Sequence, residues 1–423
     1  MKILQIVPSI SVIYGGPSQM ILGLSPALAR LGVEVTILTT NTNGDNGQKP
    51  LDVPLNQPIQ QDGYQIIYFP CSPFRRYKFS LPLLLWLNNH AHEYDVAHIH
   101  ALFSPVSSAA AAICRQKKLP YILRPLGTLD PADLQKKKQL KKLYTAIIER
   151  KNIANAAGIH FTSEQEAKIS QRFGLFTKDL VIPLGVKLQG EMAVEGDREK
   201  SREKIREKTR EKICSQYNIP ADILIVLFMS RIDPKKGLDI LIPALEKLVQ
   251  EGFQFNFILA GGNPQEPDYI EKIEKQIAAS RLRSLTTMTG FVTGELKSSL
   301  LQAADLFVLP SYYENFGIAV AEAMAVATPV VISDQVHIHQ QITDSQSGWV
   351  GKTEVLSLVS LIKEALLNPE ERQLRGFNAR EYALKNYSWD AVAKNMVAAY
   401  QKIIEKQPLT PNPSPKYGRG SNY

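Results

Sequence analysis

The sequence lacks the features of a secreted, zinc-stabilised or membrane-spanning protein. Its 423 residues include only three cysteines, Cys71, Cys114 and Cys214, which are too far apart for a disulfide framework or for the spacing of zinc ligands. No apolar run approaches the roughly 20 residues that span a bilayer. The amino terminus also lacks the apolar core and cleavage site of a signal peptide. We therefore expect a cytoplasmic protein without disulfides, a metal site or a transmembrane helix.

Two common nucleotide-binding motifs are also missing. Gly15 and Gly16 follow the first expected strand, but their spacing is neither the dinucleotide G-x-G-x-x-G nor the P-loop G-x-x-x-x-G-K. This absence counts against a nicotinamide-dependent dehydrogenase and against an NTPase. Glycines at the start of a helix still let the backbone approach a ligand, and the free amides there attract phosphate. The two glycines are therefore candidate phosphate-binding residues, with a plain strand-to-helix turn as the alternative.

The net charge of +8 does not indicate a nucleic-acid partner. Half of it comes from residues 198–212, where four Arg and four Lys stand beside four Glu. A second basic cluster lies on an expected helix and lacks the interleaved aromatics of single-strand binders; its members are Lys136, Lys137, Lys138, Lys141 and Lys142. This cluster is consistent with a solvated helix face, or with peripheral contact with anionic lipid on the inner face of the cytoplasmic membrane.

Short β-rich apolar segments alternate with amphipathic stretches, which predicts parallel sheets covered by helices. The expected strands of the first half are Ile3–Val7, Glu34–Thr39, Gln65–Phe69, Val96–His100, Tyr121–Arg124 and Gly158–Thr162. Those of the second half are Ile223–Met229, Phe255–Ala260, Thr286–Thr289, Leu306–Leu309 and Pro329–Ile332. Because a chain with 44% hydrophobic residues can fill two cores, the sequence predicts an α/β protein of two doubly wound domains.

Breaks in this alternation give the expected boundaries. Pro183 and Gly185 end the first periodic region, and REK repeats in the next segment predict an exposed, solvated helix. An apolar stripe predicts a final helix, and the Pro-containing tail after it is expected to be disordered. The division is residues 1–186 for the first domain, 187–221 for the linker with the charged insert, 222–387 for the second domain, 388–405 for the final helix and 406–423 for the tail.

Charged residues gather in two segments of the second half. Arg231 and Lys236 lie where a strand ends and a helix begins, so two cations could neutralise a departing nucleoside diphosphate. Glu314 and Glu322 are eight positions apart around the start of another helix, whose first amides form an anion site. A carboxylate on a helix of Ala, Val and Met is costly to bury without a partner, which favours a ligand hydroxyl as the partner of Glu322.

In the first half of the chain, the expected strand Val96–His100 ends with two histidines, His98 and His100. Strand alternation places both on one face, at the edge of the sheet where open α/β folds bind ligands. A histidine there can form a hydrogen bond with a substrate oxygen, and the alternative is a buried histidine with a protein partner. Arg124 ends the next strand and Thr128 lies in the loop after it, so both are candidate acceptor-binding residues. Closure of that loop explains the presence of these two residues equally well.

Together these segments resemble the large retaining glycosyltransferase family called family 4, or glycosyltransferase group 1. That family has the GT-B fold, in which two Rossmann-like domains face each other across a cleft. The likeness covers roughly residues 1–404 without the charged insert. Its most diagnostic element is the Glu-x7-Glu pattern from Glu314 to Glu322, followed by the Arg-x4-Lys-Gly segment from Arg231 to Gly237.

The resemblance implies a role for each candidate residue. His100, Arg231, Lys236 and Glu314 would act on the transferred sugar and the diphosphate. The implied donor-binding residues are Gly15, Gly16, Gly290, Phe291, Val292, Asn315, Phe316, Gly317, Ile318 and Glu322. Relatives commonly have Gly-Gly-x-x-Glu after the strand at 329–332, whereas this chain has Gln-Val-His-Ile-His-Gln at 335–340, so the contacts of that segment are left open.

The resemblance also implies a reaction. The co-substrate would be a UDP-, GDP- or ADP-sugar, and the acceptor a glycan or lipid-linked hydroxyl, as in cell-envelope polysaccharide or glycolipid synthesis. Configuration would be retained by front-face attack, with the leaving phosphate deprotonating the acceptor. The chain has no Asp-x-Asp, so we expect no metal or other cofactor. The alternatives are a nucleotide-sugar epimerase of the same fold and a catalytically degenerate nucleotide-sugar-binding subunit.

Overall fold

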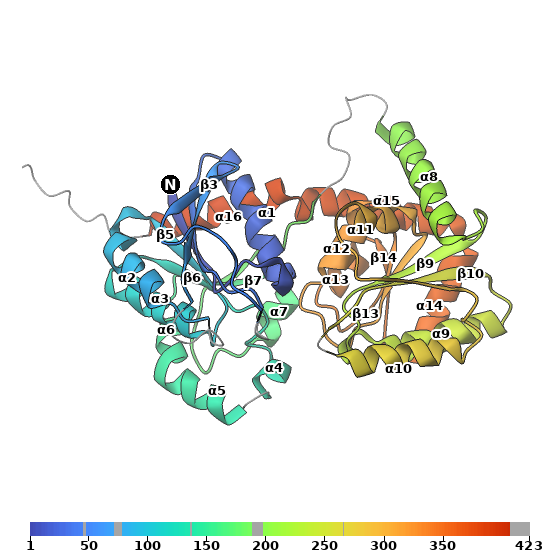
Figure 1. Ribbon diagram of the computed structural model, residues 1–423, viewed down its shortest axis with the longest axis horizontal. Coiled ribbons are helices and arrows are strands. Elements are labelled where there is room, and N and C mark those ends of the chain that lie inside the picture. Colours follow the sequence, from blue (N-terminus) through green and yellow to red (C-terminus); the bar gives the residue numbers. More distant parts are fainter. Residues whose placement is uncertain (45–47, 72–77, 136–137, 188–197, 265, 407–423) are drawn as a thin grey trace, which may run out of the picture.

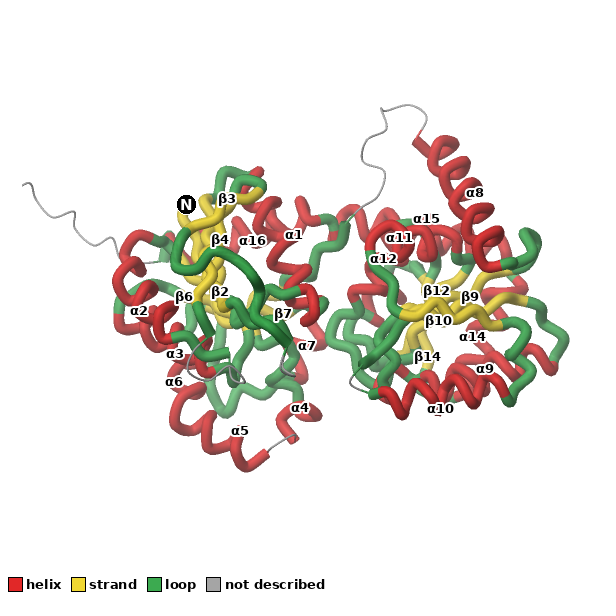
Figure 2. Tube along the Cα trace, viewed as in Figure 1, coloured by secondary structure: helices red, strands yellow, loops and turns green. Residues whose placement is uncertain are grey.

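The chain forms two parallel β-sheets, each with helices on both faces (Figure 1). The structure is a computed structural model that describes residues 1–44, 48–71, 78–135, 138–187, 198–264 and 266–406. Figure 2 shows the strands of each sheet enclosed by helices, with the two sheets well separated. The predicted α/β architecture of two doubly wound, Rossmann-like domains is confirmed.

The first sheet has the strand order β3-β4-β2-β1-β5-β6-β7-β8, in which only the edge strand β3 is antiparallel to its neighbour. Its strands are β1 Lys2–Ile6, β2 Glu34–Thr40, β3 Pro58–Gln61, β4 Tyr64–Phe69, β5 Val96–His100, β6 Tyr121–Arg124, β7 Gly158–Phe161 and β8 Asp179–Val181. The register pairs His100 of β5 with Arg124 of β6. These two side chains are therefore neighbours at the carboxyl end of the sheet.

Helices of the first domain pack on opposite faces of this sheet. Helix α1 contacts the carboxyl-terminal helix α16 on one face, while α3 contacts both α2 and α6 on the other. The bounds are η1 Val12–Tyr14, α1 Gly16–Arg30, α2 Leu81–His90, η3 Ala91–Glu93, α3 Pro105–Gln116, α4 Pro131–Gln135, α5 Lys138–Tyr144, the π-helical turn η4 Thr145–Glu149, α6 Arg150–Ala154 and α7 Glu164–Ile169.

The second sheet is entirely parallel, with the order β11-β10-β9-β12-β13-β14. Its strands are β9 Leu224–Met229, β10 Phe255–Ala260, β11 Thr286–Gly290, β12 Leu306–Leu309, β13 Val330–Ser333 and β14 Gly348–Gly351. The surrounding helices are α8 Arg198–Tyr217, η5 Pro234–Lys236, α9 Leu238–Gln250, α10 Pro267–Ala278, α11 Gly294–Ala303, α12 Ile318–Ala325, α13 His339–Asp344, α14 Val355–Leu367, α15 Pro369–Tyr387 and α16 Trp389–Ile404. Figure 1 shows α9 and α10 on one face and α11 and α12 on the other.

The eleven strands expected from the sequence are all present, four of them with the expected ends and the others within one residue at each end. The described residues contain three further strands, β3, β8 and β14, that the sequence did not predict. β3 is a polar edge strand with the sequence PIQQ, β8 has three residues, and β14 contains two glycines. None of these segments has the apolar alternation that identifies a strand from sequence.

The final helix, α16, packs on the first domain although it follows the second domain in the chain. Its Trp389 ring fills the space over two glycines, Gly23 of α1 and Gly185 of the connecting segment, where an added Cβ would clash with the ring. The Val186 amide donates to the Tyr387 carbonyl at 2.8 Å, and Arg30 pairs with Asp390 at 2.7 Å. Two chain segments therefore join the domains, and they are bonded to each other.

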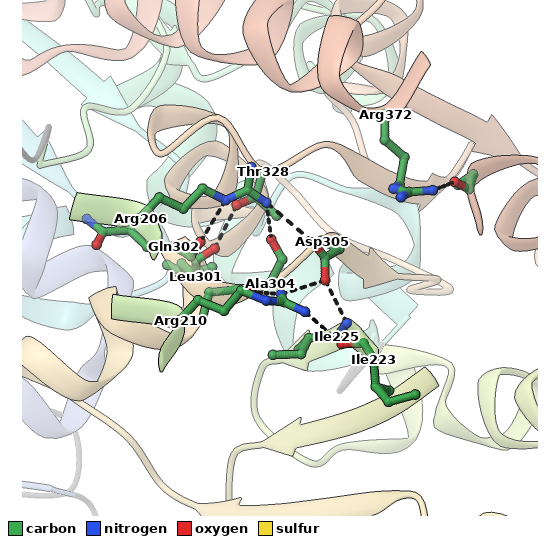
Figure 3. A network of polar contacts seen from close by, with 12 residues as sticks. Arg206, Arg210, Ile223, Ile225, Leu301, Gln302, Ala304, Asp305, Thr328 and Arg372 are labelled. Carbon is green, nitrogen blue, oxygen red and sulfur yellow. Dashed lines mark hydrogen bonds and ion pairs between the residues drawn. The ribbon is translucent and has the colours of Figure 1, made fainter. Parts of the chain in front are cut away.

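The helix expected over the REK repeats is α8, but the expectation that it is a solvated helix was wrong for one face. Arg210 donates to Asp305 Oδ2 at 2.7 Å and to the Ile223 carbonyl at 2.6 Å (Figure 3). Arg206 bonds to the carbonyls of Gln302 and Ala304 in the same network, each at 3.2 Å. The four-residue repeat places Arg206 and Arg210 on the same side of α8, and this side binds the second domain, whereas Glu207, Lys208 and Glu211 are exposed.

Several expectations fall on parts of the chain that lie outside the described residues. These are residues 188–197 of the expected linker, Lys136 and Lys137 of the basic cluster, and the tail from residue 407. None of the helices in the described ranges is both long enough and apolar enough to cross a membrane.

Candidate functional site

Lys236 is held by a short turn at the carboxyl end of β9. Asp233 caps the turn η5 by accepting from the Lys235 amide at 3.0 Å, and Gly237 ends it with φ of 73°. A Cβ at Gly237 would lie 2.1 Å from the Pro310 carbonyl oxygen, so only glycine permits this close approach. The turn therefore packs directly against Pro310, at the start of the segment that contains Glu314 and Glu322.

Glu314 forms an ion pair with Lys236, and both side chains are mostly buried. The Glu314 backbone pairs with the segment after β13: its amide donates to the Gln335 carbonyl at 3.2 Å and its carbonyl accepts from the His337 amide at 3.0 Å. The Gln-Val-His segment that departs from the family pattern therefore holds Glu314 through main-chain groups. Because main-chain bonds do not depend on the side chain, this support survives the change of sequence.

Glu322 lies on the short helix α12, for which Gly317 is the N-cap with φ of 77°. Lys297 of α11 donates to its Oε1 at 2.5 Å, while Oε2 is buried and has no hydrogen-bond partner among the described residues. Burial raises the pKa of the Glu322 carboxyl, and Lys297 opposes that shift. The protein thus satisfies one oxygen of this carboxylate, and the other remains able to accept from a ligand hydroxyl.

The other predicted donor residues at the ends of β9 and β11 differ in exposure. Arg231 is exposed beyond the end of β9, and Phe291 is 78% exposed after β11. Val292 beside it is buried, and Gly290 ends its strand with φ of 68°. An exposed aromatic ring at the carboxyl edge of the sheet is available for stacking on a base.

The two domains approach each other at the start of α12. A Cβ on Gly16 would lie 2.8 Å from Ile318 Cδ1, so the glycine lets the first loop come close to α12. Asn315 Nδ2 donates to Thr162 Oγ1 of the first domain at 3.5 Å, whereas Phe316 is buried and contacts the Tyr387 ring edge-on. Gly15, with φ of 64°, precedes α1. The predicted glycine loop and the glutamate segment are therefore adjacent.

His100 and Arg124 are buried side by side at the carboxyl end of the first sheet, with 1% and 4% exposure. His100 Nε2 bonds to Gln5 Oε1 at 2.8 Å, and its Nδ1 is buried without a partner. The Nε and Nη1 donors of Arg124 also lack partners among the described residues. Burial lowers the pKa of Arg124 to about 10, so the side chain still carries its charge at neutral pH.

The hydroxyl of Thr128 closes its own turn by donating to the Pro125 carbonyl at 2.8 Å. The sequence allowed Thr128 either to close its own loop or to bind an acceptor, and this hydrogen bond closes the loop. Gly127 in the same turn faces Tyr313 of the second domain, whose hydroxyl would lie 3.1 Å from an added Cβ. The turn therefore contributes to the domain contact through its backbone.

Sequence reasoning missed three residues that hold the site together. Lys297 pairs with Glu322, Gln5 bonds to His100, and Tyr400 of α16 bonds to Gln5. Lys297 was missed because it is one of several polar residues on an amphipathic helix. Tyr400 was assigned only to the apolar stripe of the final helix. Gln5 gave the one available signal, because a glutamine in the middle of an otherwise apolar first strand needs a buried partner.

The described residues contain no group of three or more His, Cys, Asp or Glu placed to hold a metal ion. A cavity of about 870 Å³ lies between α8, α11 and α15, and none of the predicted donor-binding residues lines it. Metal independence stays a prediction.

Comparison with known proteins matches both halves of this site. Residues 15–185 match the model described as a glycosyl transferase 4-like domain, and residues 209–382 match the model of glycosyl transferases group 1. The second match contains the Lys236–Glu314 and Lys297–Glu322 pairs. The chain belongs to the glycosyltransferase group 1 family.

The similar proteins have names that describe different glycosyltransferase reactions. The D-inositol 3-phosphate glycosyltransferase of Xylanimonas cellulosilytica is 27% identical over 93% of each chain. The alpha-D-kanosaminyltransferase of Streptomyces kanamyceticus is 32% identical, but the match covers 42% of this chain and only 46% of that protein. The structure of Anabaena HepE in complex with UDP and glucose has a TM-score of 0.71 at 18% identity, covering 95% of this chain and 99% of the other. The GT-B fold is thereby confirmed.

Proposed function

We propose that this glycosyltransferase moves a sugar from a nucleotide-sugar donor to a hydroxyl acceptor, with retention of the anomeric configuration. The observation that carries the proposal is Glu322, a buried carboxylate with one oxygen paired to Lys297 and the other without a partner. A ribose hydroxyl would supply the missing hydrogen bond. Leaving a buried acceptor unsatisfied costs about 1–3 kcal/mol, so a donor ligand gains correspondingly by filling this site.

The other charged groups suit the diphosphate of the same donor. Lys236 pairs with Glu314 just before the start of α12, where first-turn amides attract anions, and the exposed Arg231 follows the end of β9. In the reaction the bond from the anomeric carbon to the phosphate oxygen breaks and a bond to the acceptor oxygen forms on the same face. The acceptor proton passes to the leaving phosphate, and the two cations stabilise its negative charge without a metal. The UDP bound to Anabaena HepE makes a UDP-sugar the first donor to test.

Arg124 favours an acceptor that carries negative charge. It is a buried cation whose Nε and Nη1 have no hydrogen-bond partner among the described residues, and it precedes the turn in which Gly127 faces Tyr313 of the second domain. A phosphate or carboxylate on the acceptor would give this guanidinium a hydrogen-bond acceptor and a counter-charge. The name of the Xylanimonas relative describes an acceptor of this kind, inositol 3-phosphate. For this chain we propose an anionic glycan or lipid-linked acceptor of cell-envelope synthesis.

A donor screen tests the function. Purified protein is incubated with UDP-, GDP- and ADP-sugars, with and without candidate anionic acceptors, and nucleoside diphosphate release is measured. We expect one donor to be used, and Glu322→Gln to raise its KM at least about tenfold because a charge-assisted hydrogen bond is weakened. Glu274→Gln, an exposed glutamate on α10, is the matched control. Equal KM values for both variants would contradict the assigned role of Glu322.

Product analysis distinguishes the alternatives. A glycosyltransferase forms a new glycoside whose anomeric configuration NMR compares with that of the donor, and inversion would refute the retaining mechanism. An epimerase would instead change the sugar of the donor without glycosylating an alcohol. A degenerate binding subunit would be stabilised by the donor against thermal unfolding but would release no diphosphate.

The face of α5 and η4 supports a peripheral membrane contact. Leu140, Leu143 and Ile147 recur at helical spacing and are 62%, 59% and 67% exposed. The basic residues around this stripe are exposed at Lys138, Lys142, Arg150 and Lys151, whereas Lys141 turns inward to Asp133 at 2.6 Å. Apolar side chains bordered by lysines fit a bilayer with anionic headgroups, so we propose that this stripe binds the membrane that holds the acceptor.

Vesicle flotation tests this contact. The protein should float with vesicles containing phosphatidylglycerol and not with pure phosphatidylcholine, and the triple change Leu140→Gln, Leu143→Gln, Ile147→Gln should reduce the bound fraction about tenfold. Leu356→Gln, which alters a leucine of similar exposure on α14, is the control. Equal flotation of the triple variant and the control would refute a lipid contact at this face.

A further inference from the structure

A continuous buried hydrogen-bond chain leads from the segment joining the domains to His100. His160 Nε2 bonds to the Ile182 carbonyl at 2.8 Å, and His160 Nδ1 lies 3.3 Å from His98 Nε2. His98 Nδ1 bonds to the Tyr400 hydroxyl at 2.9 Å, which accepts from Gln5 Nε2 at 3.0 Å. Gln5 Oε1 completes the chain at His100 Nε2, at 2.8 Å.

The carbonyl of Ile182 fixes the direction of the first bonds. A carbonyl oxygen can only accept, so His160 Nε2 carries a proton. Burial, together with the charge of Arg124, lowers the pKa of His160 to about 3, so its ring is neutral and its Nδ1 is an acceptor. His98 Nε2 must then donate to it. Burial holds the pKa of His98 well below the usual range as well, which leaves its Nδ1 as an acceptor.

Tyr400 transmits this direction to His100. Its single hydroxyl proton is used on His98 Nδ1, so its oxygen can only accept from Gln5, which must present its amide nitrogen. The other end of Gln5 is then the carbonyl oxygen, which requires a proton on His100 Nε2. His100 is also buried with a lowered pKa and is therefore neutral. Its Nδ1 is left as an acceptor.

We infer that Tyr400 is a positioning residue that fixes His100 as the Nε2–H tautomer, with Nδ1 held as a hydrogen-bond acceptor for a hydroxyl of the transferred sugar. This inference rests on the proposed function for the identity of the ligand. Sequence reasoning allowed His100 to donate to a substrate oxygen, but the chain of bonds makes the free nitrogen an acceptor. Two members of the hydrogen-bond chain belong to segments that join the two domains: Ile182, before the linker, at one end, and Tyr400 of α16 in the middle.

Removing the Tyr400 hydroxyl breaks the chain at its centre. In Tyr400→Phe, His98 loses its donor and Gln5 Nε2 loses its acceptor, so nothing prevents the Gln5 amide from turning over. His100 would then no longer be restricted to one tautomer. Tyr121→Phe is the matched control, because Tyr121 is also buried in the first domain and gives one hydrogen bond, to the Asn152 carbonyl at 2.7 Å, outside the chain.

The first measurement does not depend on activity. Long-range ¹H–¹⁵N NMR of ¹⁵N-histidine-labelled protein, assigned with His100→Gln, reports which ring nitrogen of His100 carries the proton. We expect Nε2–H in the wild type and in Tyr121→Phe, and a mixture of tautomers in Tyr400→Phe. A proton on Nδ1 in the wild type, or an unchanged tautomer in Tyr400→Phe, overturns the inference. If Tyr400→Phe does not fold, Gln5→Leu provides the same test, because it removes the side chain that bonds to both Tyr400 and His100.

The second measurement addresses the sugar. For Tyr400→Phe we expect kcat/KM for the nucleotide-sugar to fall about tenfold, while the affinity for the nucleoside diphosphate alone changes less than about twofold. Equal losses in both would indicate a general structural effect and overturn the assigned contact with the sugar. If the wild type used no donor, the proposed function would fail, and the NMR result would still decide the tautomer.

Discussion

The polar groups of the first domain's site are buried and neutral apart from Arg124, whereas those of the second domain form ion pairs that keep partial exposure. His98, His100 and Arg124 are at most 4% exposed, but Lys236 and Glu314 keep 12% and 21% of their side-chain surface. Buried neutral groups in one fixed pattern cannot rearrange without leaving a partner unsatisfied. A partly exposed pair can exchange its partner for a ligand charge. In the proposed function, the first domain would therefore supply fixed acceptors and the second would supply exchangeable charges.

The largest expected effect comes from removing an exchangeable charge. Lys236→Met should lower kcat for sugar transfer about 10²–10³-fold, because it deletes a cation that we propose stabilises the leaving diphosphate. Lys235→Met, its exposed neighbour in the same turn, should retain activity near the wild type. Diphosphate release at saturating donor gives both values. A Lys236→Met enzyme with wild-type kcat would show that this charge is not used in the reaction.

The buried histidines of the first domain should instead affect how the free energy of unfolding depends on pH. The pKa of His160 falls from 6.5 to about 3 on folding, so the unfolded chain binds the proton more tightly. Its stabilising contribution is complete above pH 6.5 and is lost as the pH falls, by up to about 1.4 kcal/mol per pH unit. Urea unfolding between pH 7.5 and 5 should give a smaller slope for His160→Gln than for the wild type.

The exposed histidine His92 provides the comparison for that slope. His92→Gln should keep a steeper slope than His160→Gln. A common slope for both variants would mean that the burial of His160 does not determine acid sensitivity.

A third contrast lies within α8, where Arg206 and Arg210 pair with the partly buried Asp305 and Lys212 pairs with the exposed Glu295. Asp305→Asn weakens the bonds to Arg210 and to the Ile225 amide, and we expect it to lower the free energy of unfolding by about 1–3 kcal/mol. Glu295→Gln removes the exposed pair with Lys212 and should cost less than about 0.5 kcal/mol. Denaturant unfolding of both variants measures the difference, and equal losses would show that burial at Asp305 is unimportant.

The smallest expected effect is that of a chelator. Because Arg231 and Lys236 are proposed to neutralise the diphosphate, sugar transfer in excess EDTA should match transfer without it. Loss of activity that Mg²⁺ or Mn²⁺ restores would show that a metal ion provides the charge instead.

Much of the fold could be predicted because burial leaves a local periodic pattern. Strands such as Val96–His100 and Leu306–Leu309 are continuous apolar runs or alternate clearly, and they were found with their observed ends. β14 was missed because Gly348 and Gly351 give it little strand propensity, and its neighbour β13 supplies the pairing. The helix of REK repeats was found, but its packing was not, because identical repeats give no sign of which face is covered.

The site divides in the same way. Glu314, Glu322 and Lys236 could be named from sequence, because each lies where a strand or loop meets a helix and the spacing of such residues is local. The tertiary structure alone decided their partners. Lys297 pairs with Glu322 across 25 positions, Arg210 with Asp305 across 95, and His98 with Tyr400 across 302. Contacts of this kind depend on how whole elements pack, so periodicity along the chain determined the elements while packing determined which charges and tautomers they hold.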